Sequence, residues 1–195
     1  MQFSKLATLL ASATLATAAS VTFKSLDSIT RTVRFTTNPS HQQIPDLVVR
    51  GNTEVYQEFP DGWQGNWYAV KQGGNIGIPG MLGEVSFSAW GAITYFDVSA
   101  IVDAGDIHNV HMMWPAKSGT PTSGCAKFHC NNAYYAPDDV QTKTTNEKDL
   151  VCTLGETNST IIASRSADDE EAANAPVVER AFVLGKWTPT YNPQN

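Results

Sequence analysis

Residues 82–89, Leu-Gly-Glu-Val-Ser-Phe-Ser-Ala, and residues 93–98, Ile-Thr-Tyr-Phe-Asp-Val, form the stretch that best defines the fold. Both segments are rich in apolar, aromatic and β-branched residues, and Gly91 lies near the join. This pattern is typical of two strands connected by a tight turn. The sequence therefore predicts a β-hairpin at residues 82–98.

The neighbouring sequence favours further short strands, at residues 21–26, 29–36, 47–49, 54–59, 67–70 and 108–114. Apolar and polar residues alternate in most of them, and turn-forming Gly, Pro, Asn and Asp separate them. No segment shows the period of a long amphipathic helix. We therefore predict an all-β fold, a β-sandwich of short antiparallel strands.

The two ends of the chain differ from this central part. Residues 1–19 combine one basic residue, Lys5, with a short apolar run and a small-residue end. This is typical of a secretory signal peptide cut after Ala18 or Ala19, and the run is too short to span a bilayer. We predict a domain at 20–155, an acidic flexible linker at 156–176 and a last strand or tail at 177–195. The expected protein is secreted and either extracellular or associated with the cell wall.

The charge balance limits the class of partner. The formal net charge is −6 at pH 7, so phosphate backbones and anionic membranes should repel the chain. A neutral polysaccharide or a cationic partner suits it better, and we expect neither nucleic-acid binding nor a membrane span. The pair His108 and His111 would point to opposite faces of a strand, so we expect no metal site and no cofactor. The chain is expected to be a monomer, with one glycosylation sequon at Asn158.

Three cysteines, Cys125, Cys130 and Cys152, allow one internal disulfide in an exported protein. The sequence alone does not decide the pair. We favour Cys152 with either Cys125 or Cys130, because such a bridge would tie two separate segments together.

Four segments carry a resemblance to a known family. They are 59–67 (Phe-Pro-Asp-Gly-Trp-Gln-Gly-Asn-Trp), 83–87 (Gly-Glu-Val-Ser-Phe), 94–103 (with Tyr-Phe-Asp-Val-Ser and a second Asp), and 125–139 (with Ala-Tyr-Tyr-Ala-Pro-Asp-Asp). Their order and spacing resemble the thaumatin-like proteins, in particular the small thaumatin-like antigens of filamentous fungi. With only three cysteines, the chain would be a thaumatin-like sandwich without the large disulfide-rich second domain of the plant members.

The resemblance implies an acidic cleft that faces β-1,3-glucan. In a catalytic interpretation, Glu84 would be the general acid and Asp103 its partner, because two carboxylates flanking a glycosidic bond are needed for hydrolysis. The ligand contacts would come from Asp97, Asp138 and Asp139. Tryptophans at 63, 67, 90 and 114 offer a sugar-stacking face; we expect two of them in the core and Trp63 to be exposed.

Three functions remain open at this point. The first is a non-catalytic, antigenic or wall-associated protein that binds β-1,3-glucan. The second is a weak endo-β-1,3-glucanase that uses the paired carboxylates. The third is a host-interaction factor that binds a protein partner.

Overall fold

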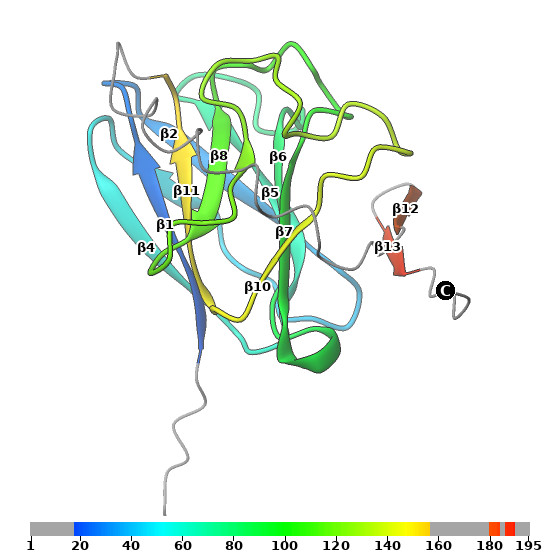
Figure 1. The fold of residues 1–195 in the computed structure, drawn as a ribbon. Helices are drawn as coiled ribbons and strands as arrows, with labels where there is room; N and C mark the ends of the chain where they lie inside the picture. The colour runs from blue at the N-terminus through cyan, green and yellow to red at the C-terminus, as the bar shows by residue number, and fades with distance from the viewer. Residues whose placement is uncertain (1–17, 157–179, 184–185, 190–195) are drawn as a thin grey trace, which may run out of the picture.

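Two β-sheets packed face to face make up the main body of the protein (Figure 1). The computed structural model describes residues 18–156, 180–183 and 186–189. Sheet A contains, in spatial order, β4 (Glu54–Phe59), β1 (Ala19–Ser25), β11 (Asp149–Leu154), β8 (Val110–Pro115) and β9 (Ser123–Gly124). Sheet B contains β10 (Lys143–Thr145), β7 (Thr94–Ser99), β6 (Leu82–Ser86), β5 (Gln64–Lys71), β2 (Arg31–Thr37) and β3 (Leu47–Val49). Strands β12 (Arg180–Val183) and β13 (Lys186–Pro189) pair with each other.

The predicted all-β sandwich without a large disulfide-rich domain is confirmed. The described residues contain no α-helix, only the short 3₁₀ turn η1 (Trp90–Ala92) that joins β6 to β7. All strand pairs are antiparallel except β1 with β11, which run parallel. That parallel pair joins β1, the first strand of the domain, to β11, its last strand. The two ends of the domain are therefore hydrogen-bonded to each other within sheet A.

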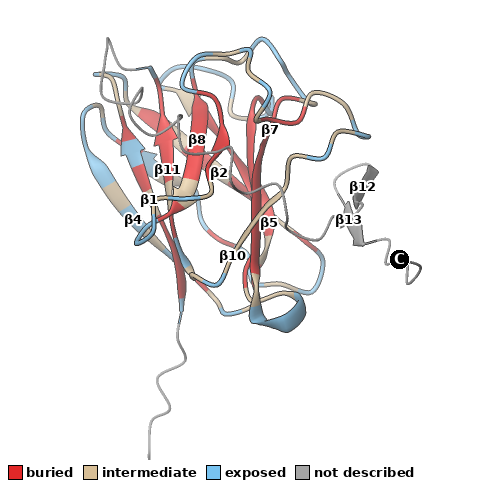
Figure 2. Cartoon of the chain, viewed as in Figure 1, coloured by how far each residue is buried: buried red, intermediate tan, exposed pale blue. Residues whose placement is uncertain are grey.

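An aromatic cluster fills the space between the sheets, and Figure 2 colours strands on both sides of it, such as β5 and β8, largely as buried. It consists of Phe23, Phe35, Phe59, Trp63 and Trp67, each at most 7% exposed. The rings of Phe23 and Trp67 meet edge to face at 5.3 Å between centroids, an arrangement that aromatic pairs prefer. Large apolar side chains from both sheets therefore hold the sandwich together.

Trp63 was expected to be exposed, and this expectation is wrong: the side chain is 0% exposed. The turn at 60–62 bends the chain so that the indole enters the core, where its Nε1 donates a hydrogen bond to the carbonyl oxygen of Gln42 at 3.0 Å. The absence of a side chain at Gly65 makes room for the ring, because a Cβ there would lie 2.7 Å from it. Trp63 therefore cannot contact a ligand at the surface.

One arginine is fully buried at the end of the sandwich. Arg31 donates to both carboxylate oxygens of Asp27 at 2.7 Å, and its other hydrogen bonds go to Asn109 Oδ1 and to the carbonyl oxygens of Ile29 and His108. Burial acts to raise the pKa of Asp27, but the hydrogen bonds and charge of Arg31 outweigh it and hold that pKa below its usual value. A buried charge is tolerable here because all its donors are satisfied.

The disulfide joins Cys125 to Cys130, with their Cα atoms 5.8 Å apart. The expectation that Cys152 takes part in the bridge is therefore wrong. Cys152 lies in β11 with its side chain in the core, 0% exposed, and burial raises its pKa to about 12. The sheet places it among apolar side chains rather than beside the 125–130 loop, so it stays a protonated, inert thiol.

Several predicted features fall outside the described residues. These are the signal peptide up to residue 17, the glycosylation site Asn158, and residues 157–176 of the acidic linker. Ala19 is already the first residue of β1, fully buried and paired with Phe59. A cut after Ala18 would therefore leave the whole of β1 intact. Strand β12 lies within the stretch expected to form a last strand or tail.

Candidate functional site

The five acidic residues predicted to form the site separate into two groups, one in the strands of sheet B and one in loops. Glu84 in β6 and Asp97 in β7 lie directly opposite each other across the sheet, as their adjacent strands suggested. Both alternate with core residues such as Val85 and Phe96, so they point to the outer face of sheet B. That face is closed here: Glu84 is 4% exposed and Asp97 0%. Asp97 Oδ2 accepts a hydrogen bond from Thr142 Oγ1 at 3.2 Å.

The other three aspartates lie in loops. Asp103 is exposed after β7, and its Oδ1 accepts a hydrogen bond from the backbone N–H of Gly105 at 2.9 Å. Asp139 Oδ2 accepts two backbone N–H groups, from Tyr135 at 2.7 Å and Ala136 at 2.9 Å, and these bonds lower its pKa. A general acid needs a raised pKa instead. Asp139 therefore holds a turn, Asp138 beside it is exposed, and Asp103 lies in a loop rather than opposite Glu84.

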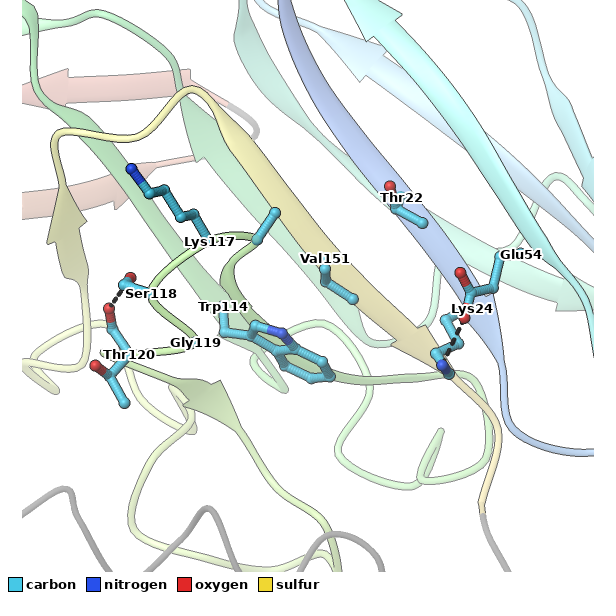
Figure 3. Close-up of a pocket in the computed structure, with 10 residues that line it drawn as sticks. Thr22, Lys24, Glu54, Trp114, Lys117, Ser118, Gly119, Thr120 and Val151 are labelled. Carbon is cyan, nitrogen blue, oxygen red and sulfur yellow. Dashed lines mark hydrogen bonds and ion pairs between the residues drawn. The ribbon is translucent and has the colours of Figure 1, made fainter.

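A groove of about 510 Å³ lies instead on the outer face of sheet A (Figure 3). Its floor consists of Thr22 from β1 and Val151 from β11, which are neighbours in the sheet. The indole of Trp114, from β8, flanks Val151 and is only partly buried. Trp114 points outward because it alternates with Met113, which points into the core. The groove therefore offers an aromatic surface to solvent.

The loop after β8 forms one wall of the groove and is held in a single shape. The backbone N–H groups of Lys117 and Ser118 donate to the carboxylate of Glu147 at 2.8 and 3.0 Å. Burial acts to raise the pKa of Glu147, but these bonds outweigh it and lower that pKa. Ser118 Oγ donates to the carbonyl oxygen of Thr120, and Gly119 supplies a positive φ of 75° that glycine adopts readily. The wall is thus preorganised, which reduces the entropy lost on binding.

The opposite wall of the groove is an ion pair. Lys24 Nζ donates to Glu54 Oε1 at 2.5 Å, across the β1–β4 pair, and Figure 3 shows this contact facing Trp114 across the groove floor. Both side chains are about half exposed. Among the described residues that line the groove, Glu54 is the only acid, so these residues include no carboxylate pair of the kind that glycosidic hydrolysis uses.

A second groove, also about 510 Å³, lies at the end of the sandwich near the buried Arg31. Its lining mixes charges: Asp27, Lys71, His108 and Glu156, with His108 Nδ1 3.1 Å from Glu156 Oε1. None of its lining residues in the described part of the chain is Trp, Tyr or Phe. Among the described residues, no group of three or more His, Cys, Asp or Glu side chains is arranged to hold a metal ion, and no helix is long and apolar enough to cross a bilayer.

Comparison with known proteins gives a close relative. The antigenic protein SchS21 of Stachybotrys chartarum is 53% identical over 137 residues, which cover 70% of this chain and 94% of the relative. The chain belongs to the SchS21 family. No family model matches the chain.

A solved structure supports the fold of this SchS21-family protein. The protein elicitor MoHrip2 from Magnaporthe oryzae superposes with a TM-score of 0.57, over 71% of this chain and 99% of MoHrip2, at 16% identity. At that identity the likeness concerns the fold alone.

The resemblance to the thaumatin-like family is therefore wrong. The sequence relative is SchS21, and the structural neighbour is an elicitor whose fold differs from that of thaumatin. The matching segments have a packing role in this SchS21-family fold. Trp63 and Trp67 fill the core, and Gly83 is needed because a Cβ there would lie 2.5 Å from the indole nitrogen of Trp67.

Trp114 is one of the four tryptophans that the sequence offers for sugar stacking, and Trp63 is the one predicted to be exposed. The available signal was the alternation in 110–115, Val-His-Met-Met-Trp-Pro, but several of its residues are apolar and either face could have been the inner one. The β8–β11 register, which depends on a strand far along the chain, turns Trp114 outward. The other groove residues belong to no motif.

Proposed function

We propose that this chain is a secreted, non-catalytic binding protein that holds a neutral polysaccharide chain in the groove beside Trp114. The observation that carries the proposal is the partly exposed indole beside an open groove with preorganised walls. A pyranose ring has an apolar face of C–H groups that stacks on an aromatic ring, and its hydroxyl groups bond to polar groups around it. Trp114 supplies the first, and Lys24, Glu54, Ser118 and Thr120 supply the second.

Charge favours a neutral ligand. The chain is acidic overall, and the Lys24–Glu54 pair leaves no net charge on that wall of the groove. On the other wall, Lys117 lies close to the Glu147 carboxylate, whose charge opposes its own. An anionic polymer would be repelled at long range, whereas a neutral glucan would not. β-1,3-Glucan is the first ligand to test, although the thaumatin resemblance that suggested it no longer supports it. Cellulose and chitin belong in the same experiment.

The test is retention on insoluble polysaccharide with a parallel assay for released reducing sugar. We expect the wild type to be retained on at least one polymer without sugar release. Trp114→Ala should lower the affinity about tenfold or more, which corresponds to about 1.4 kcal/mol. Trp90→Ala is the matched control, because Trp90 is 52% exposed but lies in η1, at the join of two sheet B strands. Equal loss in both variants, or none in Trp114→Ala, would contradict the proposal.

Two other functions give different results in this experiment. A weak glucanase would release sugar, and Glu84→Gln would abolish the release while retention survives. A host-interaction factor would show no retention on any polymer. The host-interaction function is supported by the similar proteins, since SchS21 is an antigenic protein and MoHrip2 is an elicitor. Capture by a host protein, lost in Trp114→Ala, would then place a protein partner in the groove.

A further inference from the structure

The outer face of sheet A carries one continuous row of side chains that runs across four strands. The register pairs Tyr56 of β4 with Thr22 of β1, Thr22 with Val151 of β11, and Val151 with Trp114 of β8. Partners opposite each other in a sheet point to the same face. The groove beside Trp114 is therefore the end of a longer row, and Tyr56 stands at the other end.

The row has a ring at each end and smaller side chains between them. Tyr56 is 58% exposed, and Thr22 and Val151 are half-buried. Strands in a sheet lie about 4.8 Å apart, so three spacings separate the two ring-bearing strands by about 14 Å. This is a span for several linked sugar rings rather than one.

Polar side chains border the row on both sides. One neighbouring row presents the exposed acids Glu58 and Asp149, while Ser20 between them is buried and donates its Oγ hydrogen bond to the Asp149 carboxylate. The other contains the Lys24–Glu54 ion pair. An extended sugar chain lying along the central row would present its ring faces to the aromatic side chains and its edge hydroxyls to these borders. The two acids in the first border would repel a polyanion.

We propose that Tyr56 is a second sugar-stacking subsite, so that the ligand is an extended neutral chain lying across strands β4, β1, β11 and β8. This inference rests on the proposed function and specifies its ligand as a polymer rather than a terminal sugar. The alternative role of Tyr56 is that of an exposed residue on an edge strand, where Glu54 and Glu58 on either side discourage pairing with another chain. The two roles differ in how binding depends on ligand length.

The experiment measures the affinities of a disaccharide and a hexasaccharide by calorimetry. The sugars come from whichever polysaccharide retains the wild type. We expect the wild type to bind the hexasaccharide at least tenfold more tightly than the disaccharide. Tyr56→Ala should remove this advantage and leave disaccharide binding unchanged, whereas Trp114→Ala should weaken both. Tyr56→Phe should retain the advantage, because the stacking ring remains. Thermal unfolding of Tyr56→Ala should match the wild type.

The outcomes separate this inference from the proposed function. If Trp114→Ala weakens binding and Tyr56→Ala changes neither affinity, the second subsite is wrong and the Trp114 groove stands. Equal weakening of both ligands by Tyr56→Ala also overturns the subsite, because a remote contact cannot affect a disaccharide held at Trp114. If the wild type binds no polysaccharide, both proposals fall.

Discussion

The outer faces of the two sheets contrast sharply. On sheet B, polar side chains such as Asn66, Glu84 and Asp97 lie in one row across β5, β6 and β7, and each is at most 5% exposed. On sheet A, the corresponding face is open, with Trp114, Lys24 and Glu54 around a groove. The carboxylates that the sequence made conspicuous lie on the closed face. Acidic residues in a recognisable motif are thus a poor guide to a binding site unless their exposure is known.

The largest expected effect comes from a change on the closed face. Asp97→Ala removes the acceptor of the Thr142 hydroxyl from a buried position. We expect the free energy of unfolding to fall by about 1–3 kcal/mol, because removing one partner of a buried hydrogen bond leaves the other partner unsatisfied. Urea unfolding measures it. Polysaccharide retention per folded molecule should not change.

The matched control for this stability prediction is Asp103→Ala. Asp103 is exposed and holds only the N–H of Gly105, so its loss should change stability by at most about 0.5 kcal/mol. If Asp97→Ala is as stable as Asp103→Ala, the closed face does not depend on its carboxylates. If it unfolds normally but loses retention, the site lies on sheet B and the comparison of the two faces is reversed.

Much of this contrast could not be predicted from the sequence. Local alternation located the first eight strands, and β3 and β4 match their predicted limits. It did not single out β11, whose place beside β1 joins Ser20 to Asp149 across almost the whole domain. That pairing fixes the register of β8 and turns Trp114 outward. Pairing between strands far apart in the sequence therefore determines which side chains lie on the outer face of sheet A. No local sequence pattern predicts that pairing.

The two side-chain errors, at Trp63 and in the disulfide pairing, have the same cause. Trp63 is amphipathic, and only the turn at 60–62 and the space above Gly65 decide that its ring goes inward. The Cys125–Cys130 bridge closes a short loop, whereas Cys152 faces the core from β11. The ligand contact predicted for Asp139 stays a prediction, although two backbone N–H groups already donate to its Oδ2. Each outcome depends on neighbours that only the assembled sandwich supplies.

A second prediction concerns acid and a buried histidine in sheet A. His111 in β8 is 2% exposed, its ring is 5.3 Å from that of Phe128, and burial lowers its pKa. The unfolded chain therefore takes up a proton near the ordinary pKa of about 6.5, before the folded protein does. Stability should be constant above that pH and fall as the pH drops from about 6.5 toward the lowered folded pKa.

The measurement is urea unfolding of the wild type at pH 7.5 and at lower pH. His111→Gln should flatten the decline over this interval, because the substituted side chain does not titrate. His41→Gln, which changes a half-exposed histidine in a loop, should retain it. A decline of equal size in His111→Gln would assign the acid sensitivity to other groups.

The smallest expected effect is that of Lys24→Met at the groove wall. The Lys24–Glu54 pair is about half exposed on both sides, and exposed ion pairs contribute about 0–1 kcal/mol. Stability should therefore change little, and the change should shrink further in high salt. Retention of a neutral polysaccharide should weaken only slightly, because stacking on Trp114 supplies most of the binding energy. A loss as large as that of Trp114→Ala would show instead that charge governs the groove, and a neutral chain would no longer be its natural ligand.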